Sequence, residues 1–324
     1  MIVDLPQTTT SQISKALVKI REEGGAVALG RVLTLVISTQ LGHEEDAIEA
    51  ANDASREHPM RVIVISTADE SPSTGAAFEA PRLDAQIRVG GDAGASEVIV
   101  LKAYGDTAED EEGLVTGLLL PDAPVVAWWP GEAPEVVSAS PLGRIAQRRI
   151  TDAAAQRDPR GFVEHLSNTY RPGDTDFAWT RLTLWRAQLA AVLDQPPYEP
   201  IIAAEVHGAA ASPSTSLLAA WLELQLQLPV IHEITPSAHG SSGIHGVKLF
   251  RASGVIELER THAGIVTLVQ PEQPVHDISL PRRNLRDCLA EELRRLDPDE
   301  LLGDVLTKGL RGLEGSGTTT GVLV

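Results

Sequence analysis

The sequence predicts an α/β fold with an N-terminal, largely parallel sheet with helices, a helical connector, and a C-terminal mixed α+β domain containing an antiparallel meander. Apolar runs of strand length alternate with helical patterns in the first half of the chain, which is typical of strand–helix–strand crossovers and hence of parallel pairing. Three alternating runs between residues 246 and 269 are separated only by short turns, which indicates antiparallel strands. At 324 residues, the chain has the length of about two domains.

The N-terminal elements follow from hydrophobic periodicity. Residues 11–23 place Ile13, Leu17 and Ile20 on one helical face. Residues 32–37 and 61–66 are almost wholly apolar, so we expect strands covered on both faces. The other elements expected in this half are helices over 44–57 and 108–119, the second capped by Thr107 and acidic in its first turn, and strands at 85–89, 97–101 and 125–127.

A proline-rich segment, residues 195–200, predicts the domain boundary, because prolines cannot continue a helix. We therefore expect domains at 1–195 and 196–312, followed by a disordered tail over 313–324. The connector before the boundary contains expected helices at 162–168 and 176–194. The elements expected beyond it are strands at 201–207, 230–234, 246–250, 255–260 and 265–269, and helices at 212–227, 284–296 and 299–306.

The most informative segment is Asp122-Ala-Pro-Val-Val-Ala-Trp-Trp-Pro-Gly131, a strand that ends in two tryptophans and a Pro-Gly break. Side chains alternate along a strand, so Trp128 and Trp129 point to opposite faces of the sheet. One indole packs in the core, and the other lies at a strand end, where open α/β sheets place their sites. The alternative is that both rings belong to the core, since large aromatics carry much of its buried area.

Composition excludes several classes of function. The formal net charge is −18, from 45 acidic and 27 basic residues, and this charge repels nucleic acid and anionic membranes. Cys288 is the sole cysteine, so the chain cannot form an intramolecular disulfide, a cysteine-based zinc site or an iron–sulfur site. We expect Cys288 to be a buried helical residue. The N-terminus does not resemble a signal peptide and no apolar run approaches the length of a membrane span, so we expect a cytoplasmic protein.

Motifs of catalysis and cofactor binding are missing from the sequence. It contains neither Gly-x-x-x-x-Gly-Lys-Ser/Thr nor Gly-x-Gly-x-x-Gly after a strand, and neither His-Glu-x-x-His nor Gly-x-Ser-x-Gly. We therefore expect no catalytic residues, no metal and no cofactor. The glycine-rich segment 240–246 is a weak candidate anion site through Ser241, Ser242, Gly243 and His245, and it also fits a plain loop between strands.

Arginines and tryptophans form the most suggestive polar set. Arg144, Arg148 and Arg149 follow the double tryptophan, and Arg181 and Arg186 flank Trp185 in the expected helix, with Trp179 off to one side. Arg and Trp dominate protein-binding hot spots, and Arg also grips phosphates and carboxylates. The alternative is internal ion pairing of the arginines with three nearby aspartates, Asp152, Asp174 and Asp176.

Several long segments resemble the family of glucose-6-phosphate dehydrogenase assembly proteins, OpcA, in its actinobacterial form. The specific matches are Asp122-Ala-Pro-Val-Val-Ala-Trp-Trp-Pro-Gly-Glu-Ala-Pro134, Pro141-Leu-Gly-Arg-Ile-Ala-Gln-Arg-Arg-Ile-Thr-Asp152 and Asp174-Thr-Asp-Phe-Ala-Trp-Thr-Arg-Leu-Thr-Leu-Trp-Arg186. Shorter matches occur at 58–63, 95–101 and 289–300. The resemblance covers essentially the whole chain apart from the tail.

The resemblance implies a non-enzymatic partner of glucose-6-phosphate dehydrogenase that promotes the assembly of its oligomer and activates it allosterically, and so acts on the oxidative pentose phosphate pathway and the supply of NADPH. Thiol control, known in the cyanobacterial branch, does not carry over, because Cys288 has no second thiol to pair with. The candidate partner-binding residues are Trp128, Trp129, Arg144, Arg148, Arg149, Trp179, Arg181 and Trp185. The alternative from another class is a sugar-phosphate sensor or enzyme in which Trp129 stacks on the sugar and nearby arginines hold the phosphate.

Overall fold

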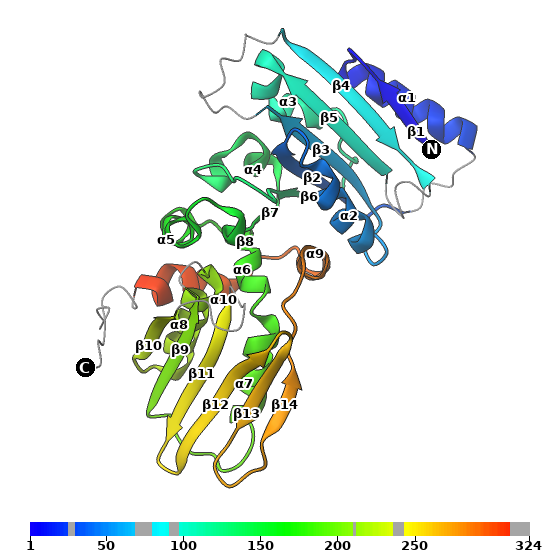
Figure 1. Cartoon of the computed structure of the whole chain (residues 1–324). Helices are drawn as coiled ribbons and strands as arrows, with labels where there is room; N and C mark the ends of the chain where they lie inside the picture. The colour runs from blue at the N-terminus through cyan, green and yellow to red at the C-terminus, as the bar shows by residue number, and fades with distance from the viewer. Residues whose placement is uncertain (25–29, 69–79, 91–96, 210–211, 236–242, 312–324) are drawn as a thin grey trace. The chain divides into compact units, whose positions relative to one another are not determined.

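The computed structural model describes the chain except for residues 25–29, 69–79, 91–96, 210–211, 236–242 and 312–324. The tail expected to be disordered therefore lies outside the described residues. Contacts divide the chain into two compact units, each built from separate stretches of sequence (Figure 1). The first comprises residues 1–152, 173–175 and 284–298, and the second comprises 153–172, 176–283 and the chain from 299 on. The contacts thus divide the chain first at Ala153 and not after the proline-rich segment at 195–200.

The first unit contains an eight-stranded sheet in the order β1-β4-β5-β3-β2-β6-β7-β8. The strands are β1 (Ile2–Leu5), β2 (Leu33–Gln40), β3 (Met60–Thr67), β4 (Arg82–Arg88), β5 (Glu97–Tyr104), β6 (Val125–Trp128), β7 (Arg148–Thr151) and β8 (Asp174–Asp176). The pairings β5–β3, β3–β2, β2–β6 and β6–β7 are parallel, whereas β1–β4 and β4–β5 are antiparallel. The prediction of a largely parallel sheet is confirmed.

The parallel strands are doubly wound. The chain enters at β2, adds β3 and then β5 on one side, and returns to add β6 and β7 on the other side of β2. The switch point therefore lies between β2 and β6. Five side chains in β2 and all but the last in β3 are buried, because a parallel sheet is stable only when both faces are covered.

Helices in this unit are α1 (Thr10–Gly24), α2 (Glu44–Ala54), α3 (Glu111–Thr116), α4 (Pro141–Ile145) and α9 (Leu285–Arg294). Helix α2 contacts β2 and β3, and α9 packs on α2 although it is more than 200 residues later in the chain (Figure 1). Cys288 is buried in α9, as expected. The helix expected over 108–119 is wrong in its extent: a 3-10 turn covers Gly105–Glu109, and Asp110, not Thr107, caps α3 by accepting from the Gly113 amide.

The helical connector also differs from its prediction. Helix α5 (Pro159–Thr169) is present, but the long helix expected over 176–194 is divided into α6 (Phe177–Thr180) and α7 (Thr183–Leu193). Asp176 ends the short strand β8, and its carboxylate accepts from the amides of Ala153 and Ala178. This buried cap fixes the start of α6 and ties it to Ala153 of the same unit.

The second unit contains a six-stranded sheet in the order β10-β9-β11-β12-β13-β14. Its strands are β9 (Ala203–Ala209), β10 (Val230–Thr235), β11 (Ile244–Arg251), β12 (Gly254–His262), β13 (Ile265–Val269) and β14 (His276–Ser279). A crossover through α8 (Pro213–Leu226) makes β9 and β10 parallel, and every pairing from β9 to β14 is antiparallel. The predicted meander is confirmed, with β14 as an additional strand. The chain then forms α10 (Glu300–Asp304) and a π-helical turn (Val305–Gly309).

Candidate functional site

The double tryptophan lies at the carboxyl end of β6, next to the switch point. Trp128 pairs with Ile37 of β2 and Ile150 of β7, and the Trp129 amide donates to the Ile150 carbonyl at 3.0 Å. The expected position at a strand end is thus confirmed. Both side chains are buried, with 0% of Trp128 and 3% of Trp129 exposed. The expectation that one indole is available at the strand end is wrong, because alternating side chains enter two covered layers here.

Arg148 and Arg149, the first two residues of β7, are buried and internally paired. Arg149 binds the Asp174 carboxylate and the Ala146 carbonyl, the latter at 2.9 Å. Arg148 binds Glu292 of α9, with Nε 3.0 Å from the carboxylate. The alternative of internal pairing with nearby aspartates thus holds for Arg149 through Asp174, whereas Arg148 pairs internally with Glu292, which was not among the expected partners. The Glu292 pairing joins residues 144 positions apart, so no local pattern in the sequence indicates it.

Trp179 and Trp185, in the second unit, are also core residues. The Trp179 indole donates to Asp299 at 2.8 Å, and the Arg186 guanidinium lies 3.7 Å from the centre of its ring. Trp185 has Arg260 at 5.6 Å from its ring centre. These Arg–Trp contacts are cation–π contacts within the protein, and the arginine at Trp185 is Arg260, not the flanking Arg181 or Arg186.

Of the eight partner-binding candidates, Arg144 and Arg181 have side chains that solvent can reach. The Arg144 side chain is 55% exposed and forms an ion pair with Glu112 at 2.9 Å. Arg181 is partly exposed, with its guanidinium 5.9 Å from the Phe177 ring centre. The six other candidates, Trp128, Trp129, Arg148, Arg149, Trp179 and Trp185, are buried, so the expected exposure of these residues is not found.

The weak anion-site candidate in segment 240–246 receives little structural support. Ser241 and Ser242 lie outside the described residues. The Gly243 carbonyl accepts from the Ala209 amide at 2.9 Å, and His245 is buried in β11. His245 therefore forms part of the second sheet and not of an open loop.

The switch point does not have the chemistry of a dinucleotide site. Open α/β sheets bind phosphates where the first crossover helix presents its N-terminus. Here the turn after β2 leads into α2, whose first turn consists of Glu44, Glu45 and Asp46. Three carboxylates at this helix end would repel a phosphate, and the turn contains Gly42 but not the Gly-x-Gly-x-x-Gly pattern of dinucleotide-binding folds.

Glu111 is a carboxyl group near this edge of the sheet whose pKa is raised. Ser38 of β2 donates to Glu111 Oε1 at 2.7 Å. Burial raises the pKa of Glu111 above its ordinary value, and the hydrogen bond from Ser38 opposes that rise. Perturbed carboxyls are frequent at functional sites and also occur in plain structural networks.

A cavity of about 750 Å³ opens in the first unit beside the start of β4. Arg82 faces Tyr104 across the β4–β5 pair, so the cavity lies toward the carboxyl ends of the parallel strands. Its polar lining residues are Gln7, Thr8, Thr9, Thr10, Arg82 and Thr107. The Arg82 guanidinium lies 4.1 Å from the Tyr104 ring centre and pairs with Asp84 at 3.2 Å.

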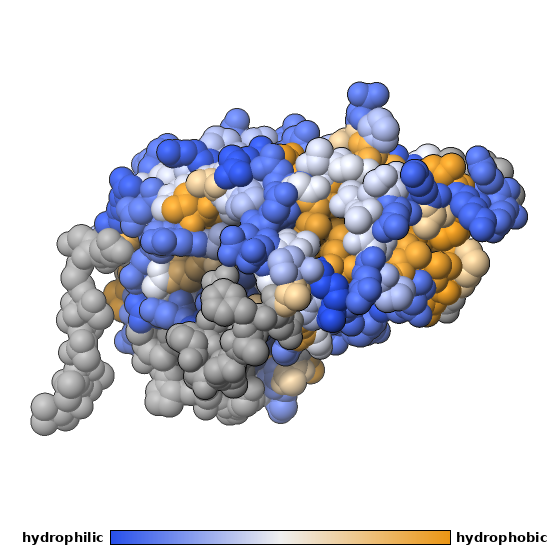
Figure 2. All heavy atoms as spheres, turned by 90° about the horizontal axis from the view of Figure 1, so that it is seen from above, coloured by the Kyte–Doolittle hydropathy of each residue, from blue (hydrophilic) through white to orange (hydrophobic). Residues whose placement is uncertain are grey.

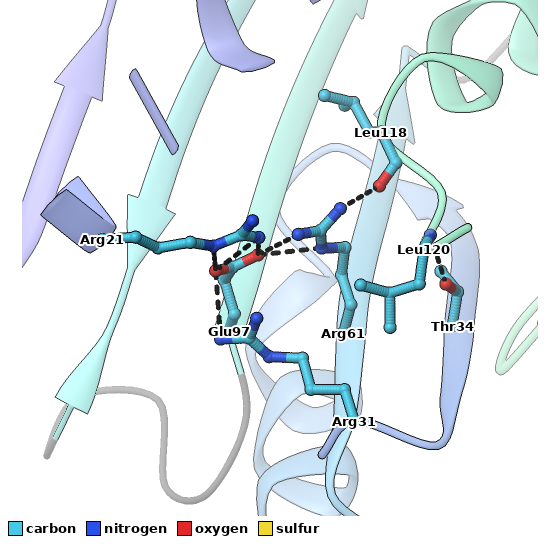
Figure 3. A network of polar contacts seen from close by, with 7 residues as sticks. All are labelled: Arg21, Arg31, Thr34, Arg61, Glu97, Leu118 and Leu120. Atoms are coloured by element: carbon cyan, nitrogen blue, oxygen red, sulfur yellow. Dashed lines mark hydrogen bonds and ion pairs between the residues drawn. The ribbon is translucent and has the colours of Figure 1, made fainter. Parts of the chain in front are cut away.

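A second polar network lies at the opposite, amino-terminal edge of the parallel strands (Figure 3). It comprises Glu97 at the start of β5, Arg61 at the start of β3, Arg21 of α1 and Arg31. All three guanidinium groups contact the one Glu97 carboxylate. Sequence reasoning missed this network, because its members are spread over residues 21 to 97.

Within the described ranges, no group of three or more His, Cys, Asp or Glu side chains is arranged to hold a metal ion. Among the helices that the structure describes, none combines the length and apolar character required to cross a membrane.

Comparison with family models identifies the class of protein. Residues 51–168 match the model described as the glucose-6-phosphate dehydrogenase subunit N-terminal domain, and residues 172–306 match the C-terminal domain of the same subunit. The chain belongs to the OpcA family of glucose-6-phosphate dehydrogenase assembly proteins.

Other comparisons are weaker. Nothing among curated proteins matches the chain. A solved structure described as an oxidoreductase from Sinorhizobium meliloti aligns at 9% identity and a TM-score of 0.44, covering 90% of this chain and 91% of that one. An oxidoreductase from Pseudomonas syringae aligns at 10% identity and a TM-score of 0.39, covering 91% of each chain. Neither likeness is close enough to carry an argument about function.

Trp129→Ala should destabilise the protein by about 3–5 kcal/mol, because it removes a large buried side chain and leaves a cavity. The measurement is urea unfolding followed by far-UV circular dichroism. Tyr198, which is 77% exposed, supplies the control: Tyr198→Ala should change stability by less than about 0.5 kcal/mol. Equal effects of the two substitutions would contradict the burial of Trp129.

Compared with wild type, Glu111→Gln should raise the free energy of unfolding more at pH 7 than at pH 4. The raised folded-state pKa means that the folded state holds the Glu111 proton more tightly than the unfolded state does, so stability falls as the pH rises above the ordinary value of 4.5. Glutamine stays neutral and removes this loss. The measurement is the difference in urea midpoint between variant and wild type at the two pH values, with exposed Glu109→Gln as the control. If the difference in urea midpoint between variant and wild type does not grow with pH, the raised pKa of Glu111 is refuted.

Proposed function

We propose that this chain is a non-enzymatic assembly factor and allosteric activator of glucose-6-phosphate dehydrogenase, acting in the cytoplasm on the oxidative pentose phosphate pathway and the supply of NADPH. The observation that carries the proposal is the match of both family domains over residues 51–168 and 172–306. We also assign the chain to the actinobacterial branch on its sequence motifs.

The chemistry of the switch point supports a role without catalysis. The sheet has the winding order of nucleotide-binding folds, but carboxylates occupy the helix end where such folds bind phosphate. The alternative of a sugar-phosphate sensor or enzyme at Trp129 loses its basis, since the indole is buried and Arg148 and Arg149 are already bound to carboxylates.

Activation requires that the chain bind the active form of the dehydrogenase more tightly than the inactive form. A coupling free energy of about 1–3 kcal/mol corresponds to roughly 5- to 150-fold. The net charge of −18 favours a partner surface with basic groups and disfavours nucleic acid or anionic membranes.

We propose that Arg144 and Arg181 contact the partner directly, each as part of its own unit. The six buried candidates would act indirectly, by stabilising the conformation of the surrounding surface. Polar side chains separate the apolar patches among the coloured residues on the face in Figure 2, so hydropathy alone marks no docking surface there. Exposed arginines are suitable contact residues, because Arg is enriched in binding hot spots.

Purified dehydrogenase should show a saturable rise in kcat/KM, several-fold or more, as this chain is added, together with a shift of its oligomer size. Steady-state assays and light scattering on the same mixtures provide the measurement. A change of oligomer size without a change in turnover would reduce the role to that of a scaffold. No change in either quantity would refute the proposal.

Arg144→Glu should weaken binding to the dehydrogenase by about tenfold, the equivalent of about 1.4 kcal/mol, if Arg144 is a contact residue. The matched control is Arg56→Glu, which makes the same charge change at a side chain that is 77% exposed in the same unit. Affinity can be measured by biolayer interferometry. If the two variants lose equal affinity, the effect is one of net charge and the Arg144 contact is refuted.

A further inference from the structure

The Glu97 network contains more positive charge than its single carboxylate neutralises. Arg61 approaches Glu97 with Nη2 at 2.7 Å, Arg21 with Nη2 at 3.0 Å and Arg31 with Nη2 at 3.1 Å. Three guanidinium groups and one carboxylate leave two surplus positive charges. The three arginines favour the charged form of Glu97, and Arg21 and Arg31 oppose the charged form of Arg61.

The network has a buried inner layer and an open outer layer. Only 1% of the Glu97 side chain and 6% of the Arg61 side chain are exposed, against 35% for Arg21 and 19% for Arg31. Arg61 and Glu97 are register partners on β3 and β5, so both side chains point to the same face of the sheet. The inner pair is thus fixed by burial, and Arg21 and Arg31 approach the Glu97 carboxylate from other sides than Arg61 (Figure 3).

The outer arginines retain hydrogen-bond donors. Arg61 uses Nε and Nη2 on Glu97 and Nη1 on the Leu118 carbonyl. Arg21 uses only Nε and Nη2 on Glu97, and Arg31 uses only Nη2. The remaining donors of Arg21 and Arg31 make no further hydrogen bond among the described residues. Both side chains are partly exposed, 35% for Arg21 and 19% for Arg31.

We propose that Arg21 and Arg31 form a binding site for a phosphate group, with Glu97 and Arg61 as the base that holds them. A phosphate dianion neutralises the two surplus charges, and its oxygens accept from guanidinium forks in the bidentate manner that Arg favours. The partly buried setting strengthens the attraction, because screening by water is reduced there. The site lies at the amino ends of the strands, away from the switch point, and it does not depend on the proposed function.

The structural alternative is that the network only fastens α1 to the sheet. Fastening needs one arginine on Glu97, since a single guanidinium group already balances the charge of the carboxylate. It does not account for three, because each added guanidinium group repels the others. In a chain of net charge −18, a local surplus of two positive charges is therefore suited to an external anion.

Isothermal titration of the full chain with inorganic phosphate, at fixed ionic strength in chloride, tests the proposal. Wild-type protein should bind phosphate saturably, and the melting temperature should rise with phosphate concentration by linkage. Arg31→Gln should weaken binding by about tenfold, since it removes a charged donor. Arg31 contacts Glu97 through a single nitrogen, so this variant should still fold.

The matched control is Arg88→Gln. Arg88 is also largely buried, but it pairs one-to-one with Glu45, at 2.6 and 2.9 Å. The substitution removes one positive charge from the same unit but leaves the excess positive charge around Glu97 unchanged. Phosphate affinity should therefore stay within twofold of wild type. Equal losses in Arg88→Gln and Arg31→Gln, or no saturable binding by wild-type protein, would overturn the proposal. Loss of dehydrogenase binding in Arg31→Gln without phosphate binding by wild type would also overturn it, in favour of an acidic protein surface at this site.

Discussion

The first unit depends on the covering of both faces of its parallel strands. Most side chains of β2, β3, β5 and β6 are buried, and a sheet of this kind is stable only with layers on both sides. Part of the cover comes from the far end of the sequence, since α9 packs on α2. Burial of Trp128 and Trp129 on opposite sides of β6 follows from the same constraint, and so does the internal use of the arginines beside them.

Buried charges in this unit join distant segments of the chain. Arg148 reaches Glu292 of α9, and Arg149 reaches Asp174 at the edge strand β8. Removing one member of such a pair leaves an unpaired buried charge, which typically costs about 3–5 kcal/mol. Arg148 and Arg149 in the Arg-rich motif between residues 141 and 152 are therefore structural, whereas Arg144 in the same motif has an exposed side chain. The Glu97 network differs from these pairs, because its guanidinium groups outnumber its carboxylate.

The strand order is typical of nucleotide-binding sheets, whereas the charges at the switch point oppose the binding of phosphate. The order of the strands is that of nucleotide-binding sheets, but Glu44, Glu45 and Asp46 occupy the helix end that would receive the phosphates. Fold alone does not imply function, and here the local charge decides against the nucleotide interpretation. Family membership supplies the positive evidence, namely a role with glucose-6-phosphate dehydrogenase.

The sequence by itself determined the α/β class, the crossover units and the C-terminal meander, because hydrophobic periodicity is local and survives without knowledge of the partner strands. It also determined the family, through long motifs around Trp128 and Arg148. The tertiary structure alone decided which of those motif residues are exposed, where Arg148 finds its counter-charge, and that Arg21, Arg31 and Arg61 meet at Glu97. These facts depend on contacts between residues tens to more than a hundred positions apart, and local patterns carry no information about such contacts.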